Sequence, residues 1–233
     1  MVRFMGQVRK GCLMRQGAPV ARPSKPWLID LTLLKPAFPS VPGDIADFNE
    51  DPSFDSWRLG DTPEDERYSL RWNEIDDDGR RLLICDRVIL VRISWDDLNN
   101  GGYVRGRQVT IDGTKYTCRL LSGGNDFRIG NNGYQGGSPE NEWDRIIGGE
   151  AKCEDLPEIM FRDESVELSD AYLSCQHNII WNWLGAVSWT QEPYRHRETA
   201  RCCRGYQSAG FFYLNTQSHR HEDIGWRPVL EPI

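Results

Sequence analysis

The sequence lacks the long apolar stretch that a membrane helix requires. Such a helix needs about 18 or more uninterrupted apolar residues, whereas the best run here, from Leu82 to Ile93, is broken by one aspartate and two arginines. Residues 1–10 also contain no apolar segment of the kind found in signal peptides. We therefore expect a protein that does not span a membrane, carries no export signal and is made in the cytoplasm.

Patterns that bind metals, phosphates or redox partners are also missing. The seven cysteines include no Cys-x-x-Cys pair and no Cys/His ligand spacing. The glycine-rich segment 123–137 lacks the Gly-Lys-Ser/Thr of a phosphate loop. Neither His177 nor His196 has a serine or cysteine at a spacing typical of a catalytic triad. The sequence thus predicts reduced cysteines, no cofactor and no catalytic residue.

The sequence has fewer basic than acidic residues, and the basic residues are unevenly distributed along the chain. A net charge of -7 argues against nucleic acid as the main partner, because duplex binding depends on basic patches. Residues 1–26 nevertheless carry six basic and no acidic residues, while residues 44–78 carry thirteen acidic residues against three arginines. The two segments could pair with each other. The simpler interpretation is that both are solvated, residues 1–26 as a basic tail and residues 27–79 as a proline-rich acidic arm. The arm is also a candidate contact between copies of the chain.

Large aromatic residues are abundant. Nine Trp, eight Tyr and eight Phe occur in 233 residues, and each Trp or Tyr combines a large apolar face with one polar group. Four of the tryptophans fall in segments predicted to be regular structure, and we expect these four to form core: Trp143, Trp181, Trp183 and Trp226. Trp189, with Tyr194 close by, is instead a candidate for ligand contact.

Secondary structure is predicted to begin near Arg80. The β-branched residues of segment 81–93 favour a strand with Ile89, Val91 and Ile93 on one face. Further on, two strand-like runs flank Asp112-Gly113, which predicts a type I′ hairpin because that turn needs positive φ at both central positions.

Short helices are predicted at two places. Ser94 can cap a turn over residues 95–98, and residues 140–147 are bounded by Ser138-Pro139 and Gly148-Gly149. After residue 179 the chain contains further strand-like segments at 200–205 and 225–230. These elements define a third region, residues 80–233, as the predicted binding domain.

Four sequence blocks in this region resemble a known family. The blocks are Asn141-Glu-Trp-Asp-Arg-Ile-Ile147, Ile180-Trp-Asn-Trp-Leu-Gly185, Arg201-Cys-Cys-Arg-Gly-Tyr206 with Ser208-Ala209, and Gly225-Trp-Arg-Pro-Val-Leu230. Their order resembles the C-type-lectin-like fold in its formylglycine-generating-enzyme-like branch, especially the variable proteins of diversity-generating retroelements in phages and bacteria. The resemblance implies an α+β domain with short antiparallel strands, one or two short helices and much loop.

The same resemblance implies a ligand surface near the C-terminus. In that family, mutagenic reverse transcription substitutes residues between the Arg-Gly block and the closing block, here residues 206–223. Independently, this aromatic-rich segment has no clean helical or strand period, so some of its rings must be exposed, as at recognition sites. The predicted ligand contacts are Trp189, Tyr194, His196, Tyr206, Gln207, Phe211, Phe212, Tyr213, Asn215, Gln217, His219 and His221.

These features predict a non-enzymatic recognition protein of phage or prophage origin, binding a protein or glycan on a host cell. A virion component and an intracellular inhibitor of a host protein, the latter using the acidic arm, remain alternatives. The family's copper oxidase uses two cysteines just before its terminal block, and this chain has none between Gly205 and Gly225. We interpret Cys202 and Cys203 as buried thiols, and the cluster at 219–223 as binding residues rather than metal ligands.

Overall fold

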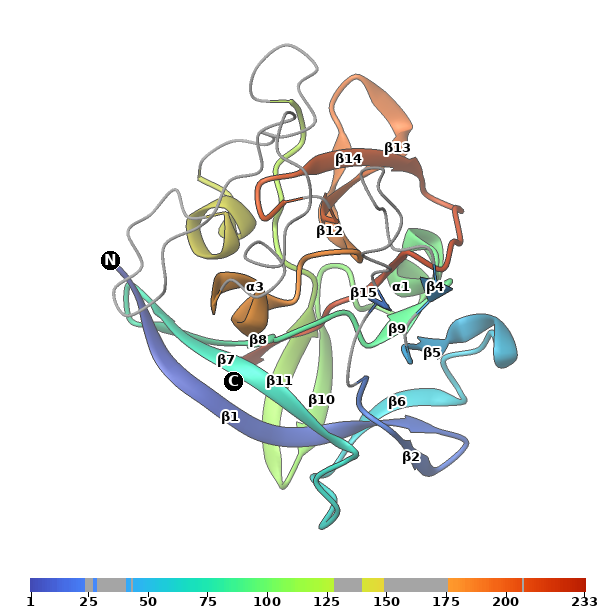
Figure 1. The fold of residues 1–233 in the computed structure, drawn as a ribbon, viewed down its shortest axis with the longest axis vertical. Helices are drawn as coiled ribbons and strands as arrows, with labels where there is room; N and C mark the ends of the chain where they lie inside the picture. Colours follow the sequence, from blue (N-terminus) through green and yellow to red (C-terminus); the bar gives the residue numbers. More distant parts are fainter. Residues whose placement is uncertain (24–26, 29–40, 43, 128–139, 149–175, 207) are drawn as a thin grey trace.

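The computed structural model describes residues 1–23, 27–28, 41–42, 44–127, 140–148, 176–206 and 208–233. Two β-sheets dominate this part of the chain, and its helices are short (Figure 1). The fold is therefore mainly β, and the predicted α+β class is wrong. No helix among the described residues is long and apolar enough to cross a membrane.

The larger sheet is antiparallel and contains eight strands. In spatial order they are β10 (Arg107–Ile111), β11 (Thr114–Arg119), β16 (Val229–Pro232), β8 (Arg80–Cys85), β7 (Ser69–Asp77), β1 (Val2–Arg15) and β2 (Ala18–Val20), with β6 (Trp57–Gly60) also paired to β1. The C-terminal strand β16 thus lies in the middle of the sheet, between strands from two other parts of the chain.

The second sheet has six strands and carries the segment of interest. Its order is β14 (Phe212–Thr216), β13 (Arg197–Gly205), β12 (Val187–Tyr194), β15 (Ile224–Trp226), β9 (Leu90–Val91) and β5 (Ala46–Asp47). A separate pair consists of β3 (Trp27–Leu28) and β4 (Val41–Pro42). The helical elements are η1 (Phe48–Glu50), α1 (Trp95–Asn100), the π-helix η2 (Trp143–Ile147) and α3 (Gln176–Trp181).

Regular structure begins at Val2 rather than near Arg80. The strands before residue 80 are the main reason why the fold is mainly β and not the predicted α+β. In β1, buried Val2 and half-buried Phe4 alternate with exposed Arg3 and Met5, the period that places one face of a strand against a core. Figure 1 shows β1 curving beside β7 along the edge of the molecule. Residues assigned to a tail and an arm therefore supply strands to the same sheet as β8 and β16.

The strand predicted over residues 81–93 is two strands, β8 and β9. Between them Asp86 and Arg87 are both buried, and they bond to each other with Arg87 Nε 3.0 Å from Asp86 Oδ1. Arg92 adopts φ 52, which an uninterrupted strand would not allow. Asp86 and Arg87 thus form a buried polar connection between the two sheets.

Several local predictions are confirmed. β10 and β11 form the predicted hairpin, with φ 52 at Asp112 and φ 73 at Gly113. Ser94 caps α1 in a reciprocal capping box with Asp97. The four tryptophans predicted as core are all fully buried (Trp143, Trp181, Trp183 and Trp226).

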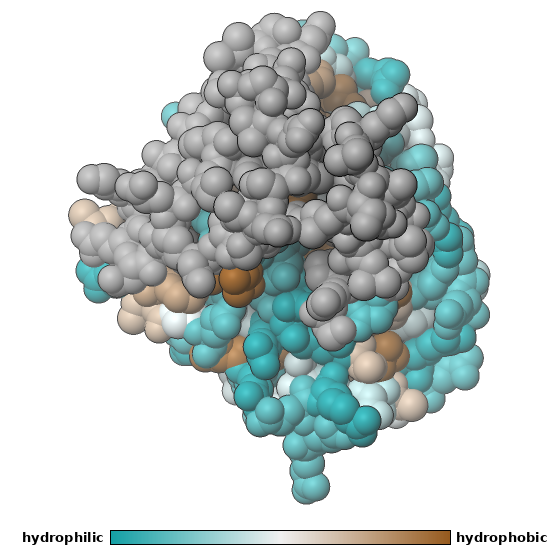
Figure 2. All heavy atoms as spheres, in the orientation of Figure 1, coloured by the Kyte–Doolittle hydropathy of each residue, from teal (hydrophilic) through white to brown (hydrophobic). Residues whose placement is uncertain are grey.

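The core has two main clusters of buried side chains. One contains Trp189 and Trp226, and the other contains Trp143, Trp181 and Trp183. Figure 2 shows that the described surface in this view is mostly hydrophilic, with apolar atoms exposed in small separate areas. The tryptophans therefore build a framework beneath a polar surface.

Candidate functional site

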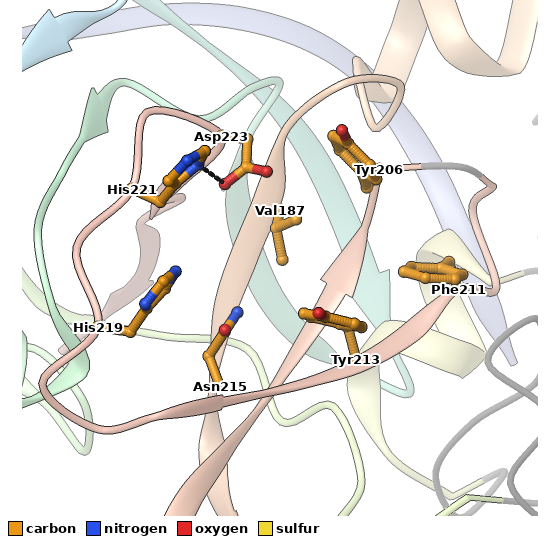
Figure 3. A pocket seen from close by; sticks show the side chains of 8 residues that line it. All are labelled: Val187, Tyr206, Phe211, Tyr213, Asn215, His219, His221 and Asp223. Carbon is orange, nitrogen blue, oxygen red and sulfur yellow. Dashed lines mark hydrogen bonds and ion pairs between the residues drawn. The ribbon is translucent and has the colours of Figure 1, made fainter. Parts of the chain in front are cut away.

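A pocket of about 450 Å³ lies on the sheet that contains β12, β13 and β14. Figure 3 shows its side chains arranged in a ring around Val187 of β12, which lies in the middle. Six of the predicted ligand contacts line it: Tyr206, Phe211, Tyr213, Asn215, His219 and His221. Val187 and Asp223 complete the lining. The structure thus brings together residues from both ends of the 206–223 segment.

The end of β13 places Tyr206 at the rim in an unusual backbone conformation. Its φ is 93, in the region that favours glycine. The Tyr206 amide N–H donates to Trp183 O at 2.7 Å, and the Tyr206 carbonyl accepts from Gly185 N at 2.9 Å. Two backbone bonds therefore hold the residue in this conformation, and such local strain is concentrated at functional sites.

Strand alternation decides which aromatic residues of β14 reach the pocket. Tyr213 is 49% exposed, whereas its neighbour Phe212 is fully buried and packs its ring 4.9 Å from that of Phe127. Phe211 lies on the pocket side and stacks on Tyr213, with ring centroids 6.0 Å apart and an interplanar angle of 16°. Because successive strand residues face opposite sides, the prediction of Phe212 as a ligand contact is wrong.

The opposite side of the pocket is polar. His219 and His221 stack with ring centroids 5.9 Å apart and an interplanar angle of 10°, and His221 Nδ1 lies 2.7 Å from Asp223 Oδ1. Asn215, from β14, lies between these groups and Tyr213 (Figure 3). The pocket therefore has an aromatic wall of Tyr206, Phe211 and Tyr213 facing a wall of imidazole, amide and carboxylate groups.

The loop between β14 and β15 is fastened to α1 and β9. Asp96 N donates to Gln217 O at 3.0 Å, and Arg92 N donates to His221 O at 3.1 Å. Arg220 forms a bidentate pair with Asp97, with contacts of 2.9 and 2.7 Å. The polar wall is thus held by backbone bonds and by an ion pair, as a pre-formed binding site requires.

Burial shifts the pKa of Tyr206 in the aromatic wall and the pKa of Cys203 in the neighbouring part of the sheet. Burial raises the pKa of the Tyr206 hydroxyl, and the negative charge of Asp223 raises it further. Beneath the pocket, burial also raises the pKa of the Cys203 thiol well above its usual value. Tyr206 therefore remains a neutral hydroxyl near neutral pH, and Cys203 remains a thiol.

No family profile matches this chain, and searches among characterised proteins and solved structures give no significant match. The resemblance to retroelement variable proteins therefore remains a prediction.

Trp189 does not reach the pocket. It is 1% exposed, and its indole N–H donates to Ile93 O at 2.8 Å. β12 lies inside the sheet, and its neighbours Ser188 and Thr190 are buried as well. The prediction of Trp189 as a ligand contact is therefore wrong, because both faces of β12 are covered at this point.

The remaining predicted contacts lie away from the pocket or outside the described residues. Tyr194 is the last residue of β12 and His196 lies in the turn before β13, with ring centroids 5.2 Å apart, and His196 contacts Asp126. Gln217, just after β14, accepts a 2.7 Å hydrogen bond from Arg201. Gln207 falls outside the described residues. The predicted set is thus divided between the pocket and two other places on the sheet.

Asp223 belongs to the 219–223 cluster interpreted above as binding residues, although it was not among the individually predicted ligand contacts. The sequence contained a pattern that points to Asp223. Asp223 follows His221 at the i, i+2 spacing, which places two side chains on one face of an extended segment. Glu222, between them, turns the other way and bonds to Arg92 at 2.6 Å. Within the described ranges, no group of three or more His, Cys, Asp or Glu side chains is arranged to hold a metal ion.

The described cysteines are buried and free of disulfides: Cys12, Cys85, Cys118, Cys202 and Cys203. Cys203 Sγ donates to Tyr213 O at 3.3 Å, while burial raises the pKa of Cys202 to about 12. For these residues, the prediction of reduced thiols is confirmed.

Proposed function

We propose that this chain is a recognition protein that binds a protein or glycan partner through the pocket. The observation that carries the proposal is the convergence of six aromatic, amide and imidazole side chains of the 206–223 segment on one exposed concavity. Pockets of about 300–1,000 Å³ with apolar walls and a few convergent polar groups are the usual ligand sites of proteins.

The division between framework and surface supports the same function. Trp181, Trp183 and Trp226 are fully buried and do not line the pocket, so exposed lining side chains such as Tyr213 can differ without altering these tryptophans. Tyrosine and asparagine suit such a surface, because tyrosine offers contact area at low entropic cost and asparagine offers adaptable hydrogen bonds. The resemblance of the four sequence blocks to phage and bacterial variable proteins supports this proposal too.

The composition of the pocket favours binding over catalysis. Asp223 could orient His221 as a general base, but the described lining residues include no serine, threonine, cysteine or lysine that His221 could activate as a nucleophile. We therefore propose a non-catalytic role for the described site.

The test compares ligands selected by the intact protein. A random peptide library and a glycan array are screened with wild-type protein. The affinity of each retained ligand is then measured for the wild type and for Tyr213→Ala. Ile179→Ala is the matched control, because Ile179 is 52% exposed, close to the value for Tyr213, and does not line the pocket.

We expect Tyr213→Ala to weaken binding about tenfold or more, as loss of an aromatic anchor usually does, and Ile179→Ala to leave binding unchanged. Equal binding by wild type and Tyr213→Ala, or no ligand retained in either screen, would contradict the proposal.

A further inference from the structure

The electrostatic character of the pocket comes mainly from Asp223. Its side chain is 30% exposed and bonds to His221, with Nδ1 of His221 2.7 Å from Oδ1. Across the pocket lies the aromatic wall, and Figure 3 shows Tyr206 and Asp223 beside each other at one end. The pocket thus combines one carboxylate with three aromatic rings.

Three arginines close in sequence to the lining residues or bonded to the same loop are paired with other carboxylates. Arg204 is fully buried and pairs with Asp144, Arg220 pairs with Asp97, and Arg92 pairs with Asp47 and Glu222. The part of the lining that the structure describes contains no lysine or arginine. Among the described residues, the ion pair of the Asp223 side chain is therefore the one with the imidazole of His221, and its negative charge can also act on a ligand that enters the pocket.

Resting on the proposed function, we propose that the pocket accepts a lysine or arginine side chain presented by a protein partner. A cation over an aromatic face is attracted by the negative quadrupole of the ring, and the attraction strengthens when water is excluded. The apolar stem of such a side chain would pack on Phe211 and Tyr213 while its charged end approaches Asp223. The overall charge of -7 favours the approach of a basic partner.

A neutral sugar is the competing ligand class. Its rings could stack on the same tyrosines and its hydroxyl groups could donate to Asp223, but a sugar carries no positive charge and could also donate to an amide oxygen at this position, so it should lose less than a cation when the carboxylate charge is removed. The two classes therefore differ in their dependence on that charge, and the experiment is built on this difference.

The experiment uses three probes with similar stems: n-butylammonium, n-butylguanidinium and n-butanol. Each is titrated into the full chain, and binding is followed by the NMR shifts of the tyrosine ring resonances. The variants are Asp223→Asn, which removes the charge and keeps the shape, and Glu64→Gln, which makes the same change in net charge at an exposed residue outside the pocket. Thermal unfolding of both variants checks that the fold is retained.

We expect at least one of the two cations to bind about tenfold more tightly than butanol to the wild type, and its binding to weaken about fivefold or more in Asp223→Asn. Glu64→Gln should bind the probes as the wild type does. Equal binding of butanol and both cations, or equal binding of the cations by Asp223→Asn and wild type, would overturn the inference.

The failure of this inference can be distinguished from the failure of the proposed function. If neither cation binds but a sugar from the glycan array loses binding in Tyr213→Ala, the pocket is a recognition site and the cation assignment is wrong. If neither the cations nor any screened ligand depends on Tyr213, both proposals are wrong.

Discussion

Trp183 donates its indole N–H to Nδ1 of His177 over 2.9 Å, and both side chains are buried, Trp183 in the core cluster that packs on the larger sheet. This bond requires an unprotonated Nδ1. Burial lowers the pKa of His177 to about 4, although a hydrogen bond with the Ile147 backbone opposes the shift. Between about pH 4 and pH 6.5, His177 is therefore neutral in the folded protein but would be protonated in the unfolded chain.

The free energy of unfolding should consequently fall as the pH drops. Because the pKa of His177 is lower in the folded than in the unfolded state, unfolding takes up a proton between about pH 6.5 and pH 4, so stability rises with pH across that window. We expect a loss of about 2 kcal/mol between pH 7 and pH 5 from this residue. Urea unfolding at the two pH values measures it.

His177→Asn supplies the control for that experiment. Its amide oxygen can accept the Trp183 N–H, and the side chain does not titrate in this range. The pH-dependent loss should shrink in the variant by the amount assigned to His177. An unchanged slope would show that other groups cause the dependence.

Phe212 and Tyr213 should respond oppositely to truncation. Phe212 is fully buried against Phe127 and the guanidinium of Arg204, so Phe212→Ala should cost about 3–5 kcal/mol of stability. Tyr213 is half-exposed, so Tyr213→Ala should cost less than about 1 kcal/mol. Chemical denaturation of both variants gives the comparison, and similar losses would mean that Tyr213 is also core.

The contrast between these neighbours shows what sequence could and could not predict. The hairpin at Asp112-Gly113 and the cap at Ser94 were predictable because local chemistry determines them. The burial of Phe212 and the exposure of Tyr213 depend on which face of β14 packs on the rest of the molecule, and Phe127, which covers Phe212, is 85 residues away in the sequence. Segment 206–223 could therefore be selected as a whole, but not resolved residue by residue.

The fold class was missed for a related reason. The alternation in β1 is visible in the sequence, yet its six basic neighbours suggested a solvated tail. Arg3 and Arg9 lie on the exposed side of β1, and Arg22 is largely buried beside Asp86, while Val2 and Leu13 are buried through pairing with β7 and β6, more than 40 residues away. Charge composition alone does not reveal such a partner strand.

Two glycines should differ sharply in their tolerance of alanine. Gly113 has φ 73 with open space where a Cβ would lie, so Gly113→Ala should cost only about 1 kcal/mol of backbone strain. A Cβ at Gly225 would collide with Leu90 O and lie 2.7 Å from Val88 Cγ1. Gly225→Ala should therefore cost about 3 kcal/mol or more, or prevent folding.

Thermal unfolding of the two variants under identical conditions tests this order. Gly79→Ala is a useful companion, because Gly79 has φ 86 and also has open space around the Cβ position. It should behave like Gly113→Ala. A Gly225→Ala protein as stable as these two would show that β15 and β9 do not approach as closely as the structure places them.

The buried pair of Arg204 and Asp144 connects the core to the pocket. Arg204 is fully buried, and its other hydrogen bonds go to carbonyl oxygens, including that of Phe211 at 3.1 Å. Asp144→Ala should leave the guanidinium without its carboxylate and cost about 3–5 kcal/mol, as breaking a buried ion pair does. Urea unfolding measures that loss.

The double variant Asp144→Leu with Arg204→Met distinguishes charge from packing. Replacing both ions by apolar side chains removes the unpaired charge, so the double variant should be more stable than Asp144→Ala alone. Arg204 also bonds to Gly210 O at 3.1 Å, next to Phe211 in the aromatic wall. We therefore expect the double variant to bind pocket ligands more weakly than wild type even where it recovers stability, because the backbone behind Phe211 has lost its support.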